Sequence, residues 1–282
     1  MNEQLVRDAG IGLRGQHTSY VLDTKPDIGW FEILADNYLT AGGLVADQLV
    51  AVRDCYPLTF HCVGMSLAGT DSLDMTYLAR IKMLAQKIEP EWISDHLCFT
   101  RYGQHHMHDL LPFPYTEEAL LNVAERVTII QEYLQRRLVI ENVSSYLQFN
   151  ESAMTEAEFL SELSIKTGCD ILFDINNAYV NEVNHDINAR DIIDKLDSDR
   201  IREIHLAGYE DKGEYLIDAH NNKVADPVWE LYKYLIDKTG AKPTLIEWDN
   251  DIPEFDVLLN EASRAQQVIE SFKVINQFEK AV

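Results

Sequence analysis

The chain has 282 residues, 46% of them hydrophobic, and a formal net charge of −23 with a pI near 4.6. This charge repels both a nucleic-acid backbone and an anionic membrane surface, so neither is expected as a partner. No run of about 18 apolar residues occurs, and the N-terminus lacks a basic segment followed by an apolar one, which predicts a soluble, cytoplasmic protein.

Short apolar segments of the strand type alternate with segments of helical period along the chain. The predicted strands are Gly10–Arg14, Trp30–Ala35, Leu58–Val63, Trp92–Phe99, Arg137–Val143, Asp170–Asn176, Ile201–Ala207 and Thr244–Trp248. The predicted helices are Leu44–Cys55, Leu73–Ile88, Thr116–Gln135, Thr155–Lys166, Ala189–Leu196, Pro227–Lys238 and Glu254–Phe272. Pro57, Pro90 and Pro243 each fall just before a strand, because proline cannot extend a helix.

This alternation predicts an α/β fold, a single (β/α)8 TIM barrel of the xylose-isomerase type over residues 1–282. The strands are continuous apolar runs, as is typical of a parallel sheet buried on both faces. An open, doubly wound sheet is the alternative. That fold usually has a glycine-rich phosphate loop after its first strand, and Gly12-Leu13-Arg14-Gly15 does not match this motif.

The four cysteines, Cys55, Cys62, Cys98 and Cys169, show no paired spacing. Three of them sit within strand-like apolar runs. Reduced thiols in the core are therefore expected, rather than a disulfide framework or a thiolate metal site.

Six predicted strands end on a histidine or a carboxylate, at His61, His96, Glu141, Asp174, His205 and Glu247. In a parallel barrel these ends meet at one rim, so the six side chains should converge. No arginine or lysine lies in the segments VIENV, LFDIN and LIEWD, which hold Glu141, Asp174 and Glu247, and a bound cation would neutralise these carboxylates. The pattern favours a metal centre over hydrogen-bonded structural residues.

Three more candidate ligands follow the sixth and seventh strands. His185 is expected in the loop after Asp174, and Asp218 and His220 are expected on one face of an extended loop. Nine candidate groups exceed the three or four ligands that a single ion needs, which predicts two or three ions. A set of histidines and carboxylates favours iron, manganese or zinc.

A histidine-rich segment, His105-His106-Met107-His108-Asp109, follows the fourth strand. It is expected to be a loop. Two interpretations stay open: a solvated, weakly metal-binding turn, or a lid that contacts the substrate.

Seven segments in this order across nearly the whole chain carry a resemblance to a known family. They are HCVG (61–64), SDHLCF (94–99), HDLLPFPYTEEAL (108–120), IENVSSY (140–146), DINNAYVNEVNHD (174–186), IHLAG (204–208) and LIEWD (245–249). The chain resembles the multinuclear non-haem iron-dependent oxidative enzymes, a formerly uncharacterised family of TIM-barrel proteins. The segments at 108–120 and 174–186 are long enough to be specific.

The resemblance implies an enzyme that holds two or three iron ions (Fe2+/Fe3+) and uses O2 to modify cysteine residues of a ribosomally made precursor peptide. It also implies a partner protein that recognises the leader of this peptide. The implied iron ligands are His61, His96, Glu141, Asp174, Asn177, His185, His205, Asp218, His220 and Glu247. Glu141 and Asp174 are the implied bridging and catalytic residues. Members commonly have Glu-Asn where this chain has Asp36-Asn37.

Two other functions stay open. Zinc or manganese TIM barrels that isomerise sugars or hydrolyse phosphate esters also place histidine, aspartate and glutamate at strand ends. A non-enzymatic barrel would store or sense metal, or act as a scaffold. Iron with oxygen consumption indicates the oxidative enzyme, whereas zinc or manganese with oxygen-independent turnover indicates the isomerase or hydrolase.

Overall fold

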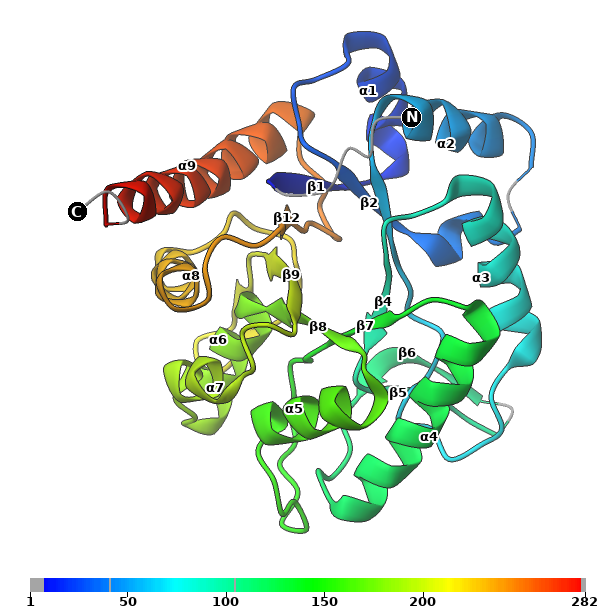
Figure 1. Ribbon diagram of the computed structural model, residues 1–282, viewed down its shortest axis with the longest axis vertical. Coiled ribbons are helices and arrows are strands. Elements are labelled where there is room, and N and C mark those ends of the chain that lie inside the picture. Colours follow the sequence, from blue (N-terminus) through cyan, green and yellow to red (C-terminus); the bar gives the residue numbers. More distant parts are fainter. Residues whose placement is uncertain (1–7, 41, 104, 280–282) are drawn as a thin grey trace.

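Eight parallel strands form a closed barrel in the order β1-β12-β9-β8-β7-β4-β3-β2 (Figure 1). The computed structural model describes residues 8–40, 42–103 and 105–279. The barrel strands are β1 (Ala9–Leu13), β2 (Phe31–Leu34), β3 (Leu58–His61), β4 (Ile93–His96), β7 (Leu138–Glu141), β8 (Asp170–Asp174), β9 (Ile201–Leu206) and β12 (Thr244–Ile246). The predicted TIM barrel is confirmed, and its closure excludes the open doubly wound sheet.

Helices surround the barrel (Figure 1). They are α1 (Thr18–Thr24), α2 (Leu44–Cys55), α3 (Met75–Ile88), α4 (Glu117–Leu134), α5 (Glu156–Thr167), α6 (Ile175–His185), α7 (Ala189–Lys195), α8 (Asp226–Thr239) and α9 (Phe255–Glu279), with the short 3-10 helices η1 (Gly15–His17) and η2 (Ala35–Tyr38). Within the part of the chain that the structure describes, no helix is long and apolar enough to cross a membrane.

The expectation of a loop after Asp174 is wrong, because α6 begins directly there. Asp174 is the N-cap of this helix, and its carboxylate accepts a hydrogen bond from the Asn177 backbone N–H. Ile175, Ala178 and Val180 are buried. This cap and this burial outweigh the low helix propensity of the asparagines in the segment.

The expectation of a loop at His105–Asp109 is also wrong. The segment belongs to β6 (His105–Leu111), which pairs antiparallel with β5 (Phe99–Tyr102) outside the barrel. Pairing of Tyr102 with His105 and of Arg101 with His106 gives the segment its strand conformation, although residues His105–Asp109 are exposed. A second small hairpin joins β10 (Glu210–Asp211) to β11 (Leu216–Ile217).

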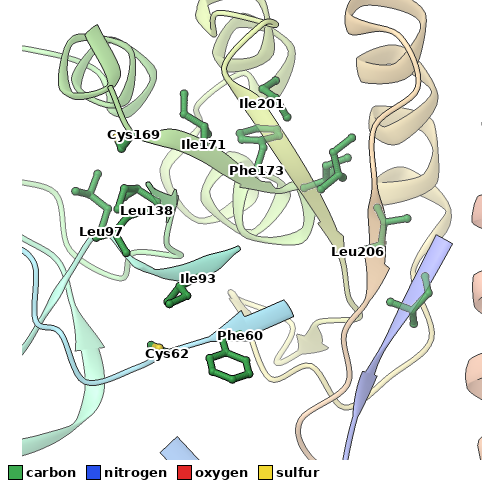
Figure 2. Close-up of a cluster of buried hydrophobic side chains, with 14 of the residues drawn as sticks. Phe60, Cys62, Ile93, Leu97, Leu138, Cys169, Ile171, Phe173, Ile201 and Leu206 are labelled. Atoms are coloured by element: carbon green, nitrogen blue, oxygen red, sulfur yellow. The ribbon is translucent and has the colours of Figure 1, made fainter. Parts of the chain in front are cut away.

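Outward side chains of the strands pack against the helices, and Figure 2 shows part of this core. The labelled side chains include Phe60, Ile93, Leu138, Ile171, Phe173 and Ile201, together with Cys62 and Cys169. All four cysteines are free, and Cys62, Cys98 and Cys169 are buried. Burying this apolar surface supplies the main favourable free energy of folding.

A smaller apolar group, the interior cluster, fills the barrel itself. Its members are Trp30, Trp92, Val139, Leu172 and Leu245. Gly10 makes room for Trp30, because a Cβ at Gly10 would lie 2.4 Å from the indole ring. Side chains alternate across a strand, so the residue two positions after an interior one also faces inward. The interior cluster is therefore followed by a second inward layer nearer the carboxyl ends of the strands.

Candidate metal centre

The six predicted strand-end side chains lie in this inward layer. They are His61 in β3, His96 in β4, Glu141 in β7, Asp174 in β8, His205 in β9 and Glu247 directly after β12. Each of the six is 8% exposed or less. Glu141, Asp174 and Glu247 come two residues after members of the interior cluster, which explains why the strand ends converge.

A first group consists of His61, His96 and Glu141. The Nε2 atoms of the two histidines are 3.1 Å apart, and Glu141 Oε2 lies 3.3 Å from His61 Nε2 and 3.2 Å from His96 Nε2. Three ligand atoms from three strands therefore face one point.

A second group consists of Glu141, Asp174, His205 and Glu247. His205 Nδ1 lies 2.9 Å from Glu247 Oε2 and 3.6 Å from Glu141 Oε1. Ligand atoms within each group all lie within 4.8 Å of one another. Glu141 belongs to both groups, and its two oxygens face different groups, which is the arrangement of a carboxylate that bridges two ions.

A third set of contacts centres on His220. Its Nε2 lies 2.6 Å from Asp218 Oδ1 and 3.9 Å from Asp174 Oδ2, and its Nδ1 lies 3.0 Å from Asp249 Oδ2. The predicted meeting of Asp218 and His220 occurs, but the expected extended loop does not. The backbone is not extended here, because the Ala219 N–H donates to the Ile217 carbonyl and His220 has φ +46°, in the left-handed region.

Asn177 and His185, the other two implied ligands, lie on α6. Asn177 is buried beside Asp174, and its side-chain amide donates to the Asn142 carbonyl while its Oδ1 has no hydrogen-bond partner among the described residues. His185 is half-buried at the end of α6, where its Nε2 lies 2.5 Å from the Ser145 carbonyl oxygen. Among the described residues, His185 falls in none of the groups of three clustered histidine, cysteine or carboxylate ligands.

Several buried atoms of the centre lack hydrogen-bond partners among the described residues. They include Glu141 Oε2, Asp174 Oδ2 and His220 Nε2. These atoms approach neighbouring nitrogens or oxygens closely, yet without the alignment of a hydrogen bond. An unsatisfied buried polar atom costs about 1–3 kcal/mol, and a bound cation would satisfy such lone pairs. The residues present therefore fit metal ions.

The second nitrogen atoms of His61 and His205 face polar partners. His61 Nδ1 lies 2.7 Å from Ser94 Oγ. His205 Nε2 lies 3.2 Å from Glu32 Oε1 and 3.5 Å from Glu203 Oε1. Trp92 Nε1 donates to Glu203, and the Thr59 hydroxyl donates to Glu32. Such outer partners orient a ligand histidine and fix its tautomer.

Glu32 and Glu203 were missed by the sequence reasoning, which considered only strand ends. Glu203 lies two residues before His205, and Glu32 lies two residues after Trp30 of the interior cluster. The signal was available, because a charged residue at an inward position of an apolar strand needs a partner inside the barrel.

One arginine enters the centre, from the end of β1. Arg14 pairs with Asp249, and its Nη2 lies 3.8 Å from Glu247 Oε1. Arg14 therefore brings one cation to these carboxylates, although it lies outside the segments that hold Glu141, Asp174 and Glu247. A single guanidinium does not balance the seven carboxylates gathered here, which are Glu32, Glu141, Asp174, Glu203, Asp218, Glu247 and Asp249.

Two groups of the centre, Asp174 and His96, hold protons more tightly than usual. Burial raises the pKa of Asp174 to about 7, and only His220 and His205 oppose this rise strongly. Burial lowers the pKa of His96, but Glu141 and Asp95 outweigh this and raise the pKa to about 9. Metal ions compete with protons for the same lone pairs, so a site with these pKa values favours cations.

A cavity of about 510 Å3 opens beside the centre. Its walls come from the segment after β7, from α5 to α7 and from the segment before α4, and they include Phe113, Phe149, Met154, Glu156, His185 and Ile192. This volume is typical of a small-molecule or peptide side-chain pocket.

Glu156, in the first turn of α5, lies in the wall of this cavity and predicts a pH effect on stability. Burial raises the pKa of Glu156 from 4.5 to about 7, although hydrogen bonds from Tyr115 and Val143 lower it. The folded protein binds this proton more tightly than the unfolded chain. The contribution of this bound proton to the free energy of unfolding is therefore complete below pH 4.5 and is lost as the pH rises through 7.

We expect wild-type protein to lose about 3 kcal/mol more unfolding free energy between pH 4.5 and pH 8 than Glu156→Gln. Denaturant unfolding at several pH values measures this difference. Glu162→Gln, at an exposed position of the same helix, should keep the wild-type profile. Parallel profiles for wild type and Glu156→Gln would show that the Glu156 proton is not bound more tightly on folding.

Fold and site together define a TIM barrel with a buried histidine and carboxylate centre at the carboxyl ends of its strands. The model of a family described as "RiPP precursor modification enzyme MbnB/TglH/ChrH" matches residues 8–270. The chain belongs to this family, which acts on precursors of ribosomally synthesised and post-translationally modified peptides. The family predicted from the seven segments is confirmed.

Relatives cover almost the whole chain. A UPF0276 protein of Acaryochloris marina is 48% identical over 260 residues, which are 92% of this chain and 94% of that protein. A UPF0276 protein of Anaeromyxobacter sp. is 44% identical over 259 residues, which are 92% of each chain.

Solved structures show the same fold at low sequence identity. A xylose isomerase domain containing protein from Salmonella typhimurium has a TM-score of 0.65 at 13% identity, covering 95% of this chain and 99% of that one. Endonuclease IV from Thermus thermophilus has a TM-score of 0.59 at 17% identity, covering 94% and 98%. These similarities support the xylose-isomerase-like barrel and nothing finer.

Proposed function

We propose that the protein is an O2-dependent oxidoreductase with two or three non-haem iron ions, which modifies cysteine residues of a precursor peptide. The observation that carries the proposal is the position of Glu141, whose two oxygens face two different groups of buried ligands. Membership of the family supplies the peptide substrate class. A separate leader-recognising partner protein belongs to the same proposal.

We assign the proposed ligands to three ion positions. His61, His96 and Glu141 would hold one ion, and Glu141, Asp174, His205 and Glu247 would hold the second. Contacts of His220 with Asp218 and Asp174 favour a third position, to which we assign Asn177 and His185 as further ligands. Asp174 would then bridge the second and third positions, as Glu141 bridges the first and second.

Iron held by these residues would supply the redox chemistry of the reaction with dioxygen. The protein supports this chemistry by position and burial. Glu141 and Asp174 are fully buried and keep the ligand groups adjacent. Hydrogen bonds from the Asn177 backbone N–H to Asp174, and from His61 Nδ1–H to Ser94 Oγ across a 2.7 Å contact, hold these ligands in place.

Glu203 is expected to position the proposed ligand His205 without binding the metal itself. Its Oε1 and Glu32 Oε1 face His205 Nε2, so they would hold the histidine with Nδ1 free for a metal. Glu203→Gln should weaken binding of the ion at His205 by about 10–100-fold while leaving the fold intact. Competition with a chromophoric chelator measures this affinity. An affinity unchanged from wild type would show that Glu203 does not position His205.

The function is tested with iron-loaded protein, purified without oxygen, and a cysteine-containing precursor peptide of the same organism. Addition of O2 should consume oxygen and change the mass of the peptide. A peptide with serine in place of cysteine should keep its mass. Oxygen-independent turnover of sugar or phosphate substrates with zinc or manganese would instead favour the isomerase or hydrolase, and metal binding without any turnover would favour storage.

A further inference from the structure

The cavity beside the centre is built from the same segment that follows the proposed ligand Glu141. Ser144 donates its hydroxyl to Asp218, and the Ser145 backbone N–H donates to Asn181. The next residue, Tyr146, accepts a hydrogen bond from the Asp218 backbone N–H through its hydroxyl. One face of this segment therefore contacts the centre, while Ser145 and Leu147 line the cavity.

The metal centre and the cavity are close enough for one bound peptide to contact both. Ser145 comes four residues after Glu141, so their Cα atoms are at most about 14 Å apart. His185 forms a second connection, because it lines the cavity and contacts the Ser145 carbonyl oxygen. A peptide whose cysteine reaches the centre would place a residue about four positions away at the cavity.

The lining of the cavity suits an apolar side chain. Phe113 and Ile192 are buried in its wall, and Leu147 and Ile187 lie at its edge, 64% and 36% exposed. Exposed apolar residues around a concave surface are typical of binding sites. The charged residues of the lining have mixed sign, with Asp191 and Glu156 against Lys195, so the cavity does not select an anion such as a phosphorylated sugar.

One buried polar atom also points to a ligand. Glu156 is 9% exposed, and its Oε1 accepts hydrogen bonds from the Tyr115 hydroxyl and the Val143 backbone N–H. Its Oε2 has no hydrogen-bond partner among the described residues. A backbone amide of a bound peptide would satisfy this atom, through its carbonyl oxygen when the carboxyl group is protonated and through its N–H when the group is ionised, whereas a purely hydrocarbon ligand would not.

We propose that this cavity binds an apolar side chain of the precursor peptide, within about four residues of the modified cysteine. The inference rests on the proposed function and adds a sequence preference to it. Specificity then comes from two contacts: the cysteine at the centre and the apolar residue in the cavity.

Fluorescent nine-residue peptides test this with iron-loaded enzyme under anaerobic conditions. One peptide carries Leu-Phe at the fourth and third positions before a central cysteine, a second carries Leu-Phe at the third and fourth positions after it, and a third has serine at all of these positions. At least one apolar peptide should bind about tenfold more tightly than the serine peptide, measured by fluorescence polarisation. Equal affinity for all three peptides would overturn the proposal.

Variants of the cavity edge test whether the cavity causes the preference for apolar peptides. Leu147→Asp and Ile187→Asp change exposed residues of the cavity edge and should remove the preference without changing the iron content. Ile165→Asp, at a position 65% exposed on α5 and outside the cavity lining, is the matched control and should keep the preference. Retention of the full preference in both cavity variants would place the apolar side chain elsewhere.

Addition of O2 to the same samples separates the two proposals. A mass change in peptides that bind without apolar preference would leave the proposed function standing and overturn the cavity assignment. An apolar preference that the cavity variants abolish, with no mass change in any cysteine peptide, would uphold the cavity as a peptide site and count against the oxidative function.

Discussion

Glu141→Ala is expected to lose at least one bound ion and to reduce turnover more than about 100-fold, beyond the effect of an outer-shell substitution. Glu141 Oε2 faces His61 and His96, and Oε1 faces His205, so the substitution removes one ligand from each of two groups. Metal analysis and the peptide mass assay measure the two effects.

Stability distinguishes a metal ligand from a structural residue. Burial raises the pKa of Glu141 well above its usual range, so its charge is unfavourable in the metal-free barrel. We therefore expect metal-free Glu141→Ala to be no less stable than metal-free wild type, while the metal-loaded variant is less stable than metal-loaded wild type. Glu261→Gln, at a buried carboxylate that contacts Val224 instead, should keep both metal and activity.

Glu141 would not be a metal ligand if the alanine variant kept full iron content and full turnover. The isosteric Glu141→Gln provides a second test, since it preserves shape and removes the charge. Its metal loss should approach that of the alanine variant.

Removal of the metal ions is expected to destabilise the protein by about 4 kcal/mol, if free metal had been present at about 1,000 times its dissociation constant. The physical reason is that the buried carboxylates outnumber the groups that can balance their charge, which are Arg14 and four histidines. Denaturant unfolding with and without a strong chelator measures the loss.

The loss should be larger at pH 8 than at pH 6. Burial raises the pKa of Glu32 and of Asp174 to about 7 in the metal-free protein, so each carboxyl group holds a proton in the folded state more tightly than in the unfolded chain. The stability linked to these protons is present below the unfolded pKa near 4 and is lost as the pH rises through 7. Identical unfolding curves with and without chelator at both pH values would contradict a metal-neutralised centre.

The barrel and the six strand-end residues could be predicted because one physical rule governs both. Parallel strands buried on both faces read as apolar runs, and a histidine or carboxylate at the end of such a run stands out. The closed arrangement then brings His61, Glu141 and His205 together without further information. This part of the site depends on strand direction alone.

The remainder of the site depends on tertiary contacts. Helix α6 forms because Asp174 caps it and because it packs on the barrel, a balance that asparagine-rich sequence does not reveal. His220 also contacts Asp249, 29 residues further along the chain, and no spacing rule specifies this contact. Arg14 reaches Asp249 across 235 residues of chain, so its role appears only once β1 and β12 are neighbours.

Glu32 and Glu203 are exceptions, because the inward orientation of their side chains could have been predicted from the sequence. Both lie in short apolar strands, and both occupy positions that alternate with outward-facing residues. Attention to strand ends alone left them out. A search of every inward position would have extended the predicted site by one layer.

The proposed function requires that the imidazole and carboxylate groups of the centre hold several ions. Its most direct test is anomalous diffraction at the iron edge, on crystals of protein purified and handled without oxygen. We predict one peak among His61, His96 and Glu141 and a second among Glu141, His205 and Glu247, with a third near His220. A map without a peak at the first two positions would contradict the claim, however active the protein proves to be.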